Sequence, residues 1–248
     1  MGIVRAICIS KERGTAKTQV KEAELTPEWG IVGDAHGGNW HRQVSMLSVE
    51  KIEAFRERGA EVEFGAFGEN LVVEGFDFAA LPVGSRFRIG TAVLEMTQIG
   101  KECHNHCQIY QRMGECIMPR EGVFARVLRG GSIKTGDKAE LLALEEKRPY
   151  TAAVITLSDK GAKGEREDKS GPLIVKMLKE AGYQVEETLL LSDEQKPLEN
   201  QLIRLADQRQ INLVLTTGGT GFSRRDVTPE ATIAVCDRMA RGIAEAIR

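Results

Sequence analysis

Residues 215–229 read L-T-T-G-G-T-G-F-S-R-R-D-V-T-P, and this stretch says most about the fold. An apolar run ends there in two threonines, and three glycines follow within four positions. The threonine and proline that close the stretch are typical of a helix N-cap and a first helical position. A strand, a glycine loop and a helix start together place backbone N–H groups and a helix dipole around an anionic ligand. The stretch therefore predicts an anion-binding turn between a strand and a helix.

The glycine loop is also followed by charge, in the form of Arg224, Arg225 and Asp226. The arginines supply cations for phosphate, and the carboxylate suits a metal or a pterin. The spacing is neither a dinucleotide fingerprint nor a P-loop. It resembles the T-x-G-G-T-G-x-x-x-R-D-x-T-P-E signature of the MogA/MoaB family, the molybdopterin-binding proteins of molybdenum cofactor synthesis. The cofactor-binding residues that this resemblance implies are Thr217, Gly218, Gly219, Thr220, Gly221 and Arg225.

Strands and helices alternate from about Thr151 onward. We expect strands over 151–157, 183–191 and 211–216, one helix that starts at 170–172 and another over 197–208. Strands separated by helices of this length predict right-handed βαβ units and a mostly parallel sheet covered on both faces, a three-layer α/β domain. Ligands of such sheets sit beyond the carboxyl ends of the strands, where both motif loops fall.

The loop after the first of these strands, residues 157–172, reads L-S-D-K-G-A-K-G-E-R-E-D-K-S-G-P. It resembles the S-D…D-x-S-G-P signature that accompanies the glycine loop in the MogA/MoaB family. The resemblance implies cofactor contacts from Ser158, Asp168, Ser170 and Gly171. Helix capping is an equally good interpretation of Asp168 and Ser170, and the two roles are compatible.

The activity that the family resemblance implies is transfer of adenylate from ATP to the terminal phosphate of molybdopterin. Acidic side chains near nucleotide phosphates are commonly Mg²⁺ ligands, so we expect Asp226 and Asp159 to be catalytic, with Mg²⁺ and ATP as cofactors. Asp226 is expected to matter most, because its carboxylate faces the mouth of the glycine loop. A MogA-like domain continues past residue 248 through another helix and strand. We therefore expect an incomplete second domain with little transfer activity.

Short strand-like runs, broken by glycine-rich turns, fill the chain before about residue 144. The runs are 4–10, 70–73, 86–89, 92–99 and 138–144, and only 49–58, capped by Ser48, is typical of a helix. Many short strands with turns predict a β-rich barrel. The charged segment 145–150 is typical of a linker, so we expect domains over 1–144 and 151–248.

Five phrases follow one another in this first segment. They are G-I-V-G-D-A-H (30–36), H-R-Q-V-S-M-L-S (41–48), F-G-E-N-L-V-V-E-G (67–75), L-P-V-G (81–84) and I-G-K-E-C-H (99–104). Together they resemble the MOSC family, the domain found at the carboxyl end of molybdenum cofactor sulfurases and in small stand-alone proteins. The resemblance implies a β-rich barrel that binds a molybdenum pterin or carries sulfur on Cys103.

Cys103 suits either role, because a thiolate is a soft ligand for molybdenum and a persulfide carrier needs an activated, partly exposed thiol. Lys101 and His104 place cationic or titratable groups beside it. A buried, inert cysteine is the alternative interpretation. Further candidates for the cofactor pocket are His36 and His41, in a Gly/Asn/Trp loop, and Arg42, whose guanidinium matches phosphate oxygens.

A zinc or iron–sulfur site is a competing interpretation of the cysteines. Its ligands would be Cys103, Cys107 and Cys116 with His104 or His106. The C-x₃-C-x₈-C spacing is not that of a zinc finger or ribbon. Cys8 and Cys236 fall in a predicted strand and helix, and we expect both to pack in the core.

The bulk composition excludes several classes of partner. The 248 residues carry 34 basic and 36 acidic side chains, a net charge of −2, so no global field recruits nucleic acid or a membrane. The first residues do not resemble a signal peptide, and an odd count of five cysteines argues against a secreted disulfide framework. We expect a cytoplasmic homo-oligomer whose partners are molybdopterin, a sulfur donor and molybdoenzyme acceptors.

Three functions are open on the sequence. The first is molybdenum cofactor biosynthesis, in which the fusion lets a labile pterin pass between two sites without release. The second is a module that only binds or stores the pterin cofactor. The third is a MOSC-type reductase of N-hydroxylated compounds.

Overall fold

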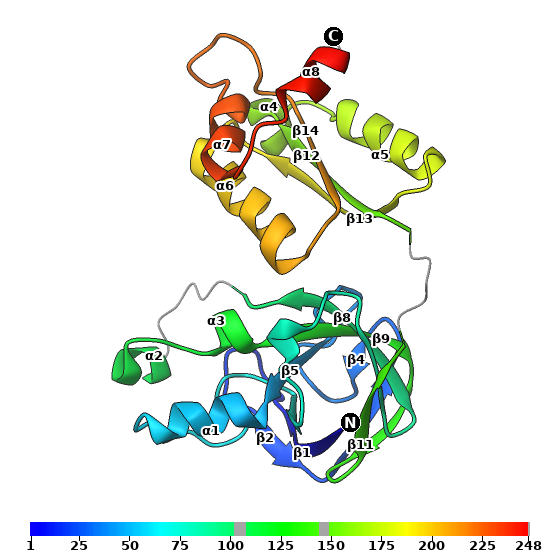
Figure 1. Cartoon of the computed structure of the whole chain (residues 1–248), viewed down its shortest axis with the longest axis vertical. Helices are drawn as coiled ribbons and strands as arrows, with labels where there is room; N and C mark the ends of the chain where they lie inside the picture. The colour runs from blue at the N-terminus through cyan, green and yellow to red at the C-terminus, as the bar shows by residue number, and fades with distance from the viewer. Residues whose placement is uncertain (102–107, 144–148, 248) are drawn as a thin grey trace. The chain divides into compact units, whose positions relative to one another are not determined.

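The computed structural model describes residues 1–101, 108–143 and 149–247, and the chain divides into two compact units, Met1–Glu145 and Glu146–Arg248 (Figure 1). Each unit has hydrophobic clusters of its own. Within the described ranges, no helix is long and apolar enough to cross a bilayer.

The first unit is a closed β-barrel. Its wall runs in the order β11-β7-β8-β9-β5-β6-β1, and β1 pairs with β11 to close the ring. The strands are β1 (Gly2–Ile9), β5 (Val44–Ser48), β6 (Leu71–Glu74), β7 (Arg86–Ile89), β8 (Ala92–Ile99), β9 (Val123–Arg129) and β11 (Lys138–Leu142). β5 and β6 are parallel, and the other neighbours in the ring are antiparallel. The predicted β-rich barrel is confirmed.

Four short strands lie outside the ring. β2 (Thr18–Val20) pairs with β1, and a smaller sheet has the order β10 (Gly131–Lys134), β3 (Glu22–Thr26) and β4 (Gly30–Ile31). The helical segments of this unit are α1 (Val49–Glu57), η1 (Phe78–Ala80), α2 (Gln108–Met113) and α3 (Met118–Glu121).

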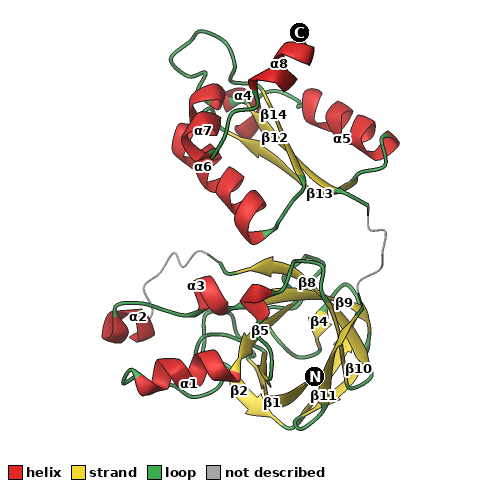
Figure 2. Cartoon of the chain, in the orientation of Figure 1, coloured by secondary structure: helices red, strands yellow, loops and turns green. Residues whose placement is uncertain are grey.

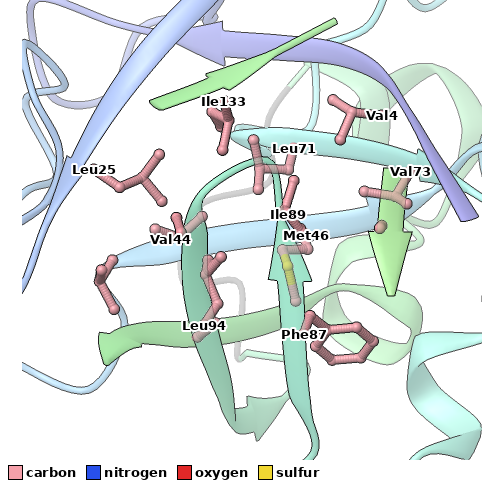
Figure 3. Close-up of a cluster of buried hydrophobic side chains, with 14 of the residues drawn as sticks. Val4, Leu25, Val44, Met46, Leu71, Val73, Phe87, Ile89, Leu94 and Ile133 are labelled. Carbon is pink, nitrogen blue, oxygen red and sulfur yellow. The ribbon is translucent and has the colours of Figure 1, made fainter. Parts of the chain in front are cut away.

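The main hydrophobic core of the first unit lies between the strands of this barrel. Successive side chains of a strand point to opposite faces, so alternate residues such as Val44 and Met46 of β5 enter the same cluster. They pack there with Leu71 of β6, Phe87 of β7 and Leu94 of β8 (Figure 3).

Helix α1 packs on a second cluster, to which it contributes the buried side chains Ile52 and Phe55. The helix predicted over 49–58 is confirmed, one residue shorter than expected. Ser48 stands at the N-cap position, but its hydroxyl donates to the Glu50 carboxylate at 2.7 Å instead of accepting from a backbone N–H. The predicted N-cap position of Ser48 is therefore confirmed, without a capping hydrogen bond from its side chain.

The second unit contains a parallel three-stranded sheet in the order β13-β12-β14 (Figure 2). Its strands are β12 (Thr151–Leu157), β13 (Gln184–Leu191) and β14 (Leu213–Thr217). Its helices are α4 (Asp159–Ala162), α5 (Ser170–Glu180), α6 (Gln195–Ile203), which continues as a π-helical turn η2 (Arg204–Gln208), α7 (Thr228–Val235) and α8 (Arg241–Ile247). The predicted alternation of strands and helices is confirmed.

Two hydrophobic clusters cover opposite faces of this sheet. Ile155 and Leu157 of β12 pack with Leu198 of α6, whereas Val154 of the same strand packs with Leu178 of α5. The predicted cover on both faces is confirmed. Both motif loops begin where a strand, β12 or β14, ends.

The expectation for Cys236 is wrong. Helix α7 ends at Val235, and Cys236 follows as its C-cap residue with an exposed thiol. Cys8, by contrast, is buried on β1 as expected.

Candidate functional site

The glycine loop joins β14 to α7 and folds closely over the end of β12. Gly218 has φ +86°, and a Cβ at this position would lie 2.2 Å from the Leu157 carbonyl oxygen. Gly219 has φ +60°, and its Cβ would lie 2.6 Å from the Thr228 hydroxyl. Only glycine adopts this path without strain. The predicted strand, glycine loop and helix start thus occur together.

Thr228 holds this loop in place. Its hydroxyl donates to the Gly218 carbonyl oxygen at 2.8 Å, and its N–H donates to that of Gly219 at 3.0 Å. Among the described residues, the N–H groups of Gly219 and Thr220 have no acceptor, whereas that of Gly221 faces the Asp226 carboxylate. A fixed loop with free N–H donors suits an anion.

Arg225 and Asp159 meet across the mouth of the two motif loops. The Arg225 Nε and Nη2 atoms donate to the two Asp159 carboxylate oxygens at 3.0 and 2.6 Å. This hydrogen bond from Arg225 is the main reason that the pKa of Asp159 lies below its usual value. The Asp159 N–H also donates to the Asp193 carboxylate at 2.8 Å, and the Asp193 N–H donates back at 3.1 Å. The structure therefore brings together two predicted site residues that are far apart in sequence.

Asp226 closes the segment that carries the arginines. Its carboxylate accepts from the Ser223 N–H at 2.8 Å, and hydrogen bonds from Ser223 lower the pKa of this group. A Cβ on Gly221 would lie 2.8 Å from the same carboxylate, so the loop passes directly beside it. Arg224 is exposed.

The predicted residues of the first motif loop act as helix caps. The Asp168 carboxylate accepts from the N–H groups of Ser170 and Gly171 at the start of α5, both at 3.0 Å. The Ser158 hydroxyl accepts from the Gly161 N–H at 3.1 Å and caps α4. Capping, one of the two interpretations of Asp168, is therefore present, and it leaves the second carboxylate oxygen of Asp168 beside Gly171.

Thr156 is a polar residue of this region that the sequence analysis missed. It is buried at the end of β12, and within the described chain its hydroxyl has no hydrogen-bond partner. A Cβ on Gly171 would lie 2.7 Å from that hydroxyl, which places it beneath the first turn of α5. A threonine within the apolar run of β12 was its signal in the sequence.

The first unit has a pocket of about 1050 Å³ on the barrel. Its basic lining residues are Lys17, His36, Arg42, Lys101 and Arg112, and its acidic ones are Glu61 and Glu63. Arg42 lies over the ring of Trp40, with 4.8 Å from the guanidinium carbon to the ring centroid, a cation–π contact at the pocket. Three of the predicted cofactor contacts thus line one cavity.

His41 is placed elsewhere. It is not among the residues that line the pocket, and its Nε2 atom lies 3.0 Å from the Gln98 side-chain oxygen. The hydroxyl of Thr97 donates to the His41 carbonyl oxygen at 2.5 Å, which ties the residue to β8.

A buried polar network forms the floor of the pocket. The Lys17 ammonium and the Asp34 carboxylate are 2.5 Å apart, with side chains only 2% and 3% exposed. Asn70 donates to the same carboxylate at 2.9 Å, and the His36 N–H donates to it at 2.8 Å. Asp34 and Asn70 stand inside the phrases G-I-V-G-D-A-H and F-G-E-N-L, but the sequence did not indicate that these phrases meet.

The predicted thiol site lies mostly outside the described residues. Cys103, His104, His106 and Cys107 all fall in 102–107. Cys116 is half-buried and lines the pocket, as do Lys101 and Gln108. No three His, Cys, Asp or Glu side chains gather as a metal site in the ranges that the structure describes. The choice between a sulfur carrier and a metal site therefore stays a prediction.

Comparison with known families agrees with both sequence resemblances. Residues 33–140 match the MOSC domain, and residues 153–248 match the family described as a probable molybdopterin binding domain.

Similar curated proteins match the second unit. A molybdopterin adenylyltransferase from Escherichia coli K12 is 43% identical over 98 residues, which cover 38% of this chain and 50% of that protein. One from Pyrococcus furiosus is 44% identical over 96 residues, which cover 38% of this chain and 54% of that protein. The chain spans about half the length of these relatives. Among solved structures, the YUAD protein from Bacillus subtilis aligns with 58% of this chain and 98% of its own, at 21% identity and a TM-score of 0.49.

Proposed function

We propose that this chain, in which a MOSC domain precedes a molybdopterin-binding domain, binds and handles the molybdenum cofactor. The observation that carries the proposal is the glycine loop of the second unit. It has free N–H donors at Gly219 and Thr220 among the described residues and stands beside the Arg225–Asp159 pair. Molybdopterin ends in a phosphate, and such donors and a nearby guanidinium suit that group.

Adenylyl transfer is the activity we assign to the second unit. A phosphate oxygen of molybdopterin would attack the α-phosphorus of ATP, and pyrophosphate would leave. The loop N–H groups would stabilise charge on the phosphates. Mg²⁺ would neutralise the leaving group, and Asp226 would hold it, because its carboxylate lies beside Gly221 of the glycine loop.

The test is ATP-dependent adenylation of molybdopterin by the full chain and by Asp226→Asn. We expect slow turnover by the chain itself and a further loss of roughly 10²-fold in the variant, because the charge is lost. The variant should retain the pterin, because the loop donors remain. Lys176→Gln is the control, since Lys176 is an exposed cation on α5. Wild-type turnover in Asp226→Asn would refute the catalytic assignment, and failure of the wild-type chain to bind molybdopterin would refute the proposal itself.

Binding without transfer is a second candidate, and the Asp159 side chain supports it. Both carboxylate oxygens accept hydrogen bonds from Arg225, so this predicted catalytic group has no oxygen free of that cation. A storage module would retain molybdopterin in equal amount with and without ATP and would release no pyrophosphate. The same assay therefore separates storage from transfer.

For the MOSC domain we propose cofactor or sulfur binding through Cys103. Cys103→Ala should abolish retention of molybdenum by the full chain, and Cys236→Ala, at an exposed helix end, should not. Elemental analysis of the purified proteins measures both. Stoichiometric zinc that disappears together with the fold in Cys103→Ala would favour the metal-site interpretation instead.

A further inference from the structure

His36 lies beside the buried Lys17–Asp34 pair of the first unit. The His36 ring is partly exposed, at 35% of its side-chain surface, and the residue lines the pocket. Its Nδ1 atom lies 3.2 Å from the Asp34 Oδ1 atom and 3.4 Å from the Lys17 Nζ atom. One ring nitrogen therefore lies between a group that only accepts hydrogen bonds and a group that only donates them.

A neutral imidazole can satisfy only one of these neighbours at a time. With a proton on Nδ1, the ring donates to Asp34 and offers a lone pair at Nε2. With the proton on Nε2, Nδ1 accepts from Lys17 and the ring offers an N–H at Nε2. The choice between the two neighbours sets the kind of hydrogen bond that His36 can offer to a ligand.

Both Asp34 carboxylate oxygens accept hydrogen bonds from donors other than the imidazole. Its Oδ1 atom already accepts from the His36 backbone N–H at 2.8 Å, and its Oδ2 atom accepts from Lys17, Asn70 and the Ser10 N–H. The ammonium of Lys17 has three N–H groups, one of which bonds to Asp34. The pair therefore favours a bare Nδ1 atom that accepts from Lys17.

The ring also stays neutral near pH 7. Burial and the positive charges of Lys17 and Arg13 hold the pKa of His36 below its ordinary value of 6.5, against an opposing effect of Asp34. These are the charged groups that act on the ring in the described residues. The protein thus holds a neutral imidazole in a pocket where, among the described lining residues, the basic ones outnumber the acidic ones.

We infer that Lys17 and Asp34 are positioning residues that make His36 a neutral N–H donor to an oxyanion group bound in this pocket. The inference rests on the proposed function for the anionic nature of the ligand. When the ring changes tautomer, Nδ1 releases one proton to water and Nε2 takes one up, so the charge of the imidazole does not change. A ligand that presents an N–H or ammonium group to His36 would meet a donor there, so this residue disfavours cations at its position.

The first experiment uses inorganic phosphate and molybdate as probes of the full chain. Long-range ¹⁵N–¹H NMR spectra distinguish the protonated from the bare ring nitrogen, and loss of a signal in His36→Gln identifies His36. We expect the proton on Nε2 already in the free protein, and a shift of the Nε2–H signal when phosphate or molybdate binds. A ring that keeps its proton on Nδ1, becomes doubly protonated, or does not respond to either anion would overturn the inference. A response to molybdate alone would point to the metal end of the cofactor, and a response to phosphate alone to its phosphate.

The second experiment compares two substitutions of the partly exposed His36, which is not part of a hydrophobic cluster. His36→Gln keeps one N–H donor and should bind the responding anion within about threefold of the wild type. His36→Phe has no donor and should lose about tenfold, the usual effect of one hydrogen bond to a charged group. Arg88→Gln, which removes an exposed cation from β7, should bind normally. Equal affinities for the Gln and Phe variants would contradict the donor role.

The role of Lys17 is tested with Lys17→Met. Without the ammonium, the His36 proton should return to Nδ1 and the Asp34 carboxylate, even in the presence of the anion. An Nε2–H that persists in a folded Lys17→Met protein would show that Lys17 does not position the ring. If that variant does not fold, the spectra of the wild type and the two His36 variants still decide the inference. None of these measurements uses molybdopterin, so their outcome is independent of cofactor binding by the second unit.

Discussion

The Asp34 carboxylate of the first unit is buried and accepts several hydrogen bonds. Lys17, Asn70 and two backbone N–H groups donate to its two oxygens, and its side chain is 3% exposed. Burial opposes the charge, but these hydrogen bonds and the Lys17 charge prevail and lower the pKa of Asp34 below 3.8. A group whose pKa is lowered by folding contributes its full stabilisation at pH values above its pKa in the unfolded chain. This contribution is lost as the pH falls through its pKa in the folded protein.

Asp34→Asn should therefore destabilise the barrel unit by about 3–5 kcal/mol at pH 7, because it leaves the Lys17 charge buried without its partner. The difference from wild type should shrink below about pH 4. Urea unfolding followed by amide exchange of β5 and β6 measures both values. Glu140→Gln, which breaks an exposed ion pair with Arg88, is the control and should cost about 1 kcal/mol or less. An equal loss for Asp34→Asn at both pH values would contradict the role of the charge.

Burial should also make the Cys8 thiol less reactive than that of Cys236. Burial, and then the charge of Glu69, raise the pKa of the Cys8 thiol to about 12, whereas Cys236 is exposed. Iodoacetamide at pH 8 should modify Cys236 in the native protein and Cys8 only after denaturation, because the thiolate is the nucleophile. Peptide mass spectrometry reads each site, with Cys236→Ser as the control. Comparable labelling of Cys8 in the native state would show that it is not shielded.

Two effects require a glycine at Gly218 of the glycine loop: its backbone conformation and the lack of space for a side chain. At Gly218 the positive φ disfavours any side chain, and the Leu157 carbonyl also occupies the space that a Cβ would need. Gly182, after α5, has the same φ of +86° but nothing within 4 Å of its Cβ position. The two glycines therefore separate backbone strain from steric overlap.

Gly182→Ala should destabilise the second unit by about 1–2 kcal/mol, the cost of a left-handed conformation for alanine. Gly218→Ala should cost about 1–3 kcal/mol more because of the overlap, and it should also weaken molybdopterin binding. Hydrogen exchange of β12 and β14 in the full chain measures the stabilities. Similar losses for the two variants would mean that the loop shifts away from Leu157 at little cost.

The strands whose bounds were predicted correctly share one feature of sequence. β7, β8 and β12 have the predicted bounds, since each is an unbroken run of strand-forming residues between turns. β5 was missed because V-S-M-L-S is buried at every position and does not alternate. β2 and β4 are two or three residues long and leave no periodic signal.

The candidate site was predictable to the extent that it lies in continuous motifs. The glycine loop and Asp159 were found in this way, but the contact between Asp159 and Arg225 joins loops 66 residues apart. Lys17 was missed because a buried lysine looks like any surface lysine until Asp34 is placed beside it. Spacing along the chain cannot supply such pairs.

Each unit encloses its own hydrophobic clusters, so stability should be divided between them. Phe87→Ala in the barrel core should cost about 3–5 kcal/mol, and Leu205→Ala beneath the sheet of the second unit about 2–5 kcal/mol. Hydrogen exchange should show each loss only in the strands of the substituted unit, β8 or β12. Faster exchange in both units after either single substitution would show that they unfold together.

Both tryptophans of the chain, Trp29 and Trp40, belong to the barrel unit, and Trp40 lines its pocket against Arg42. Their rings are 50% and 39% exposed, so their surroundings include solvent that a ligand would displace. Light absorbed at the red edge of the protein spectrum is therefore emitted from the first unit alone. Tryptophan fluorescence should therefore report directly on ligands that enter the pocket of the barrel unit.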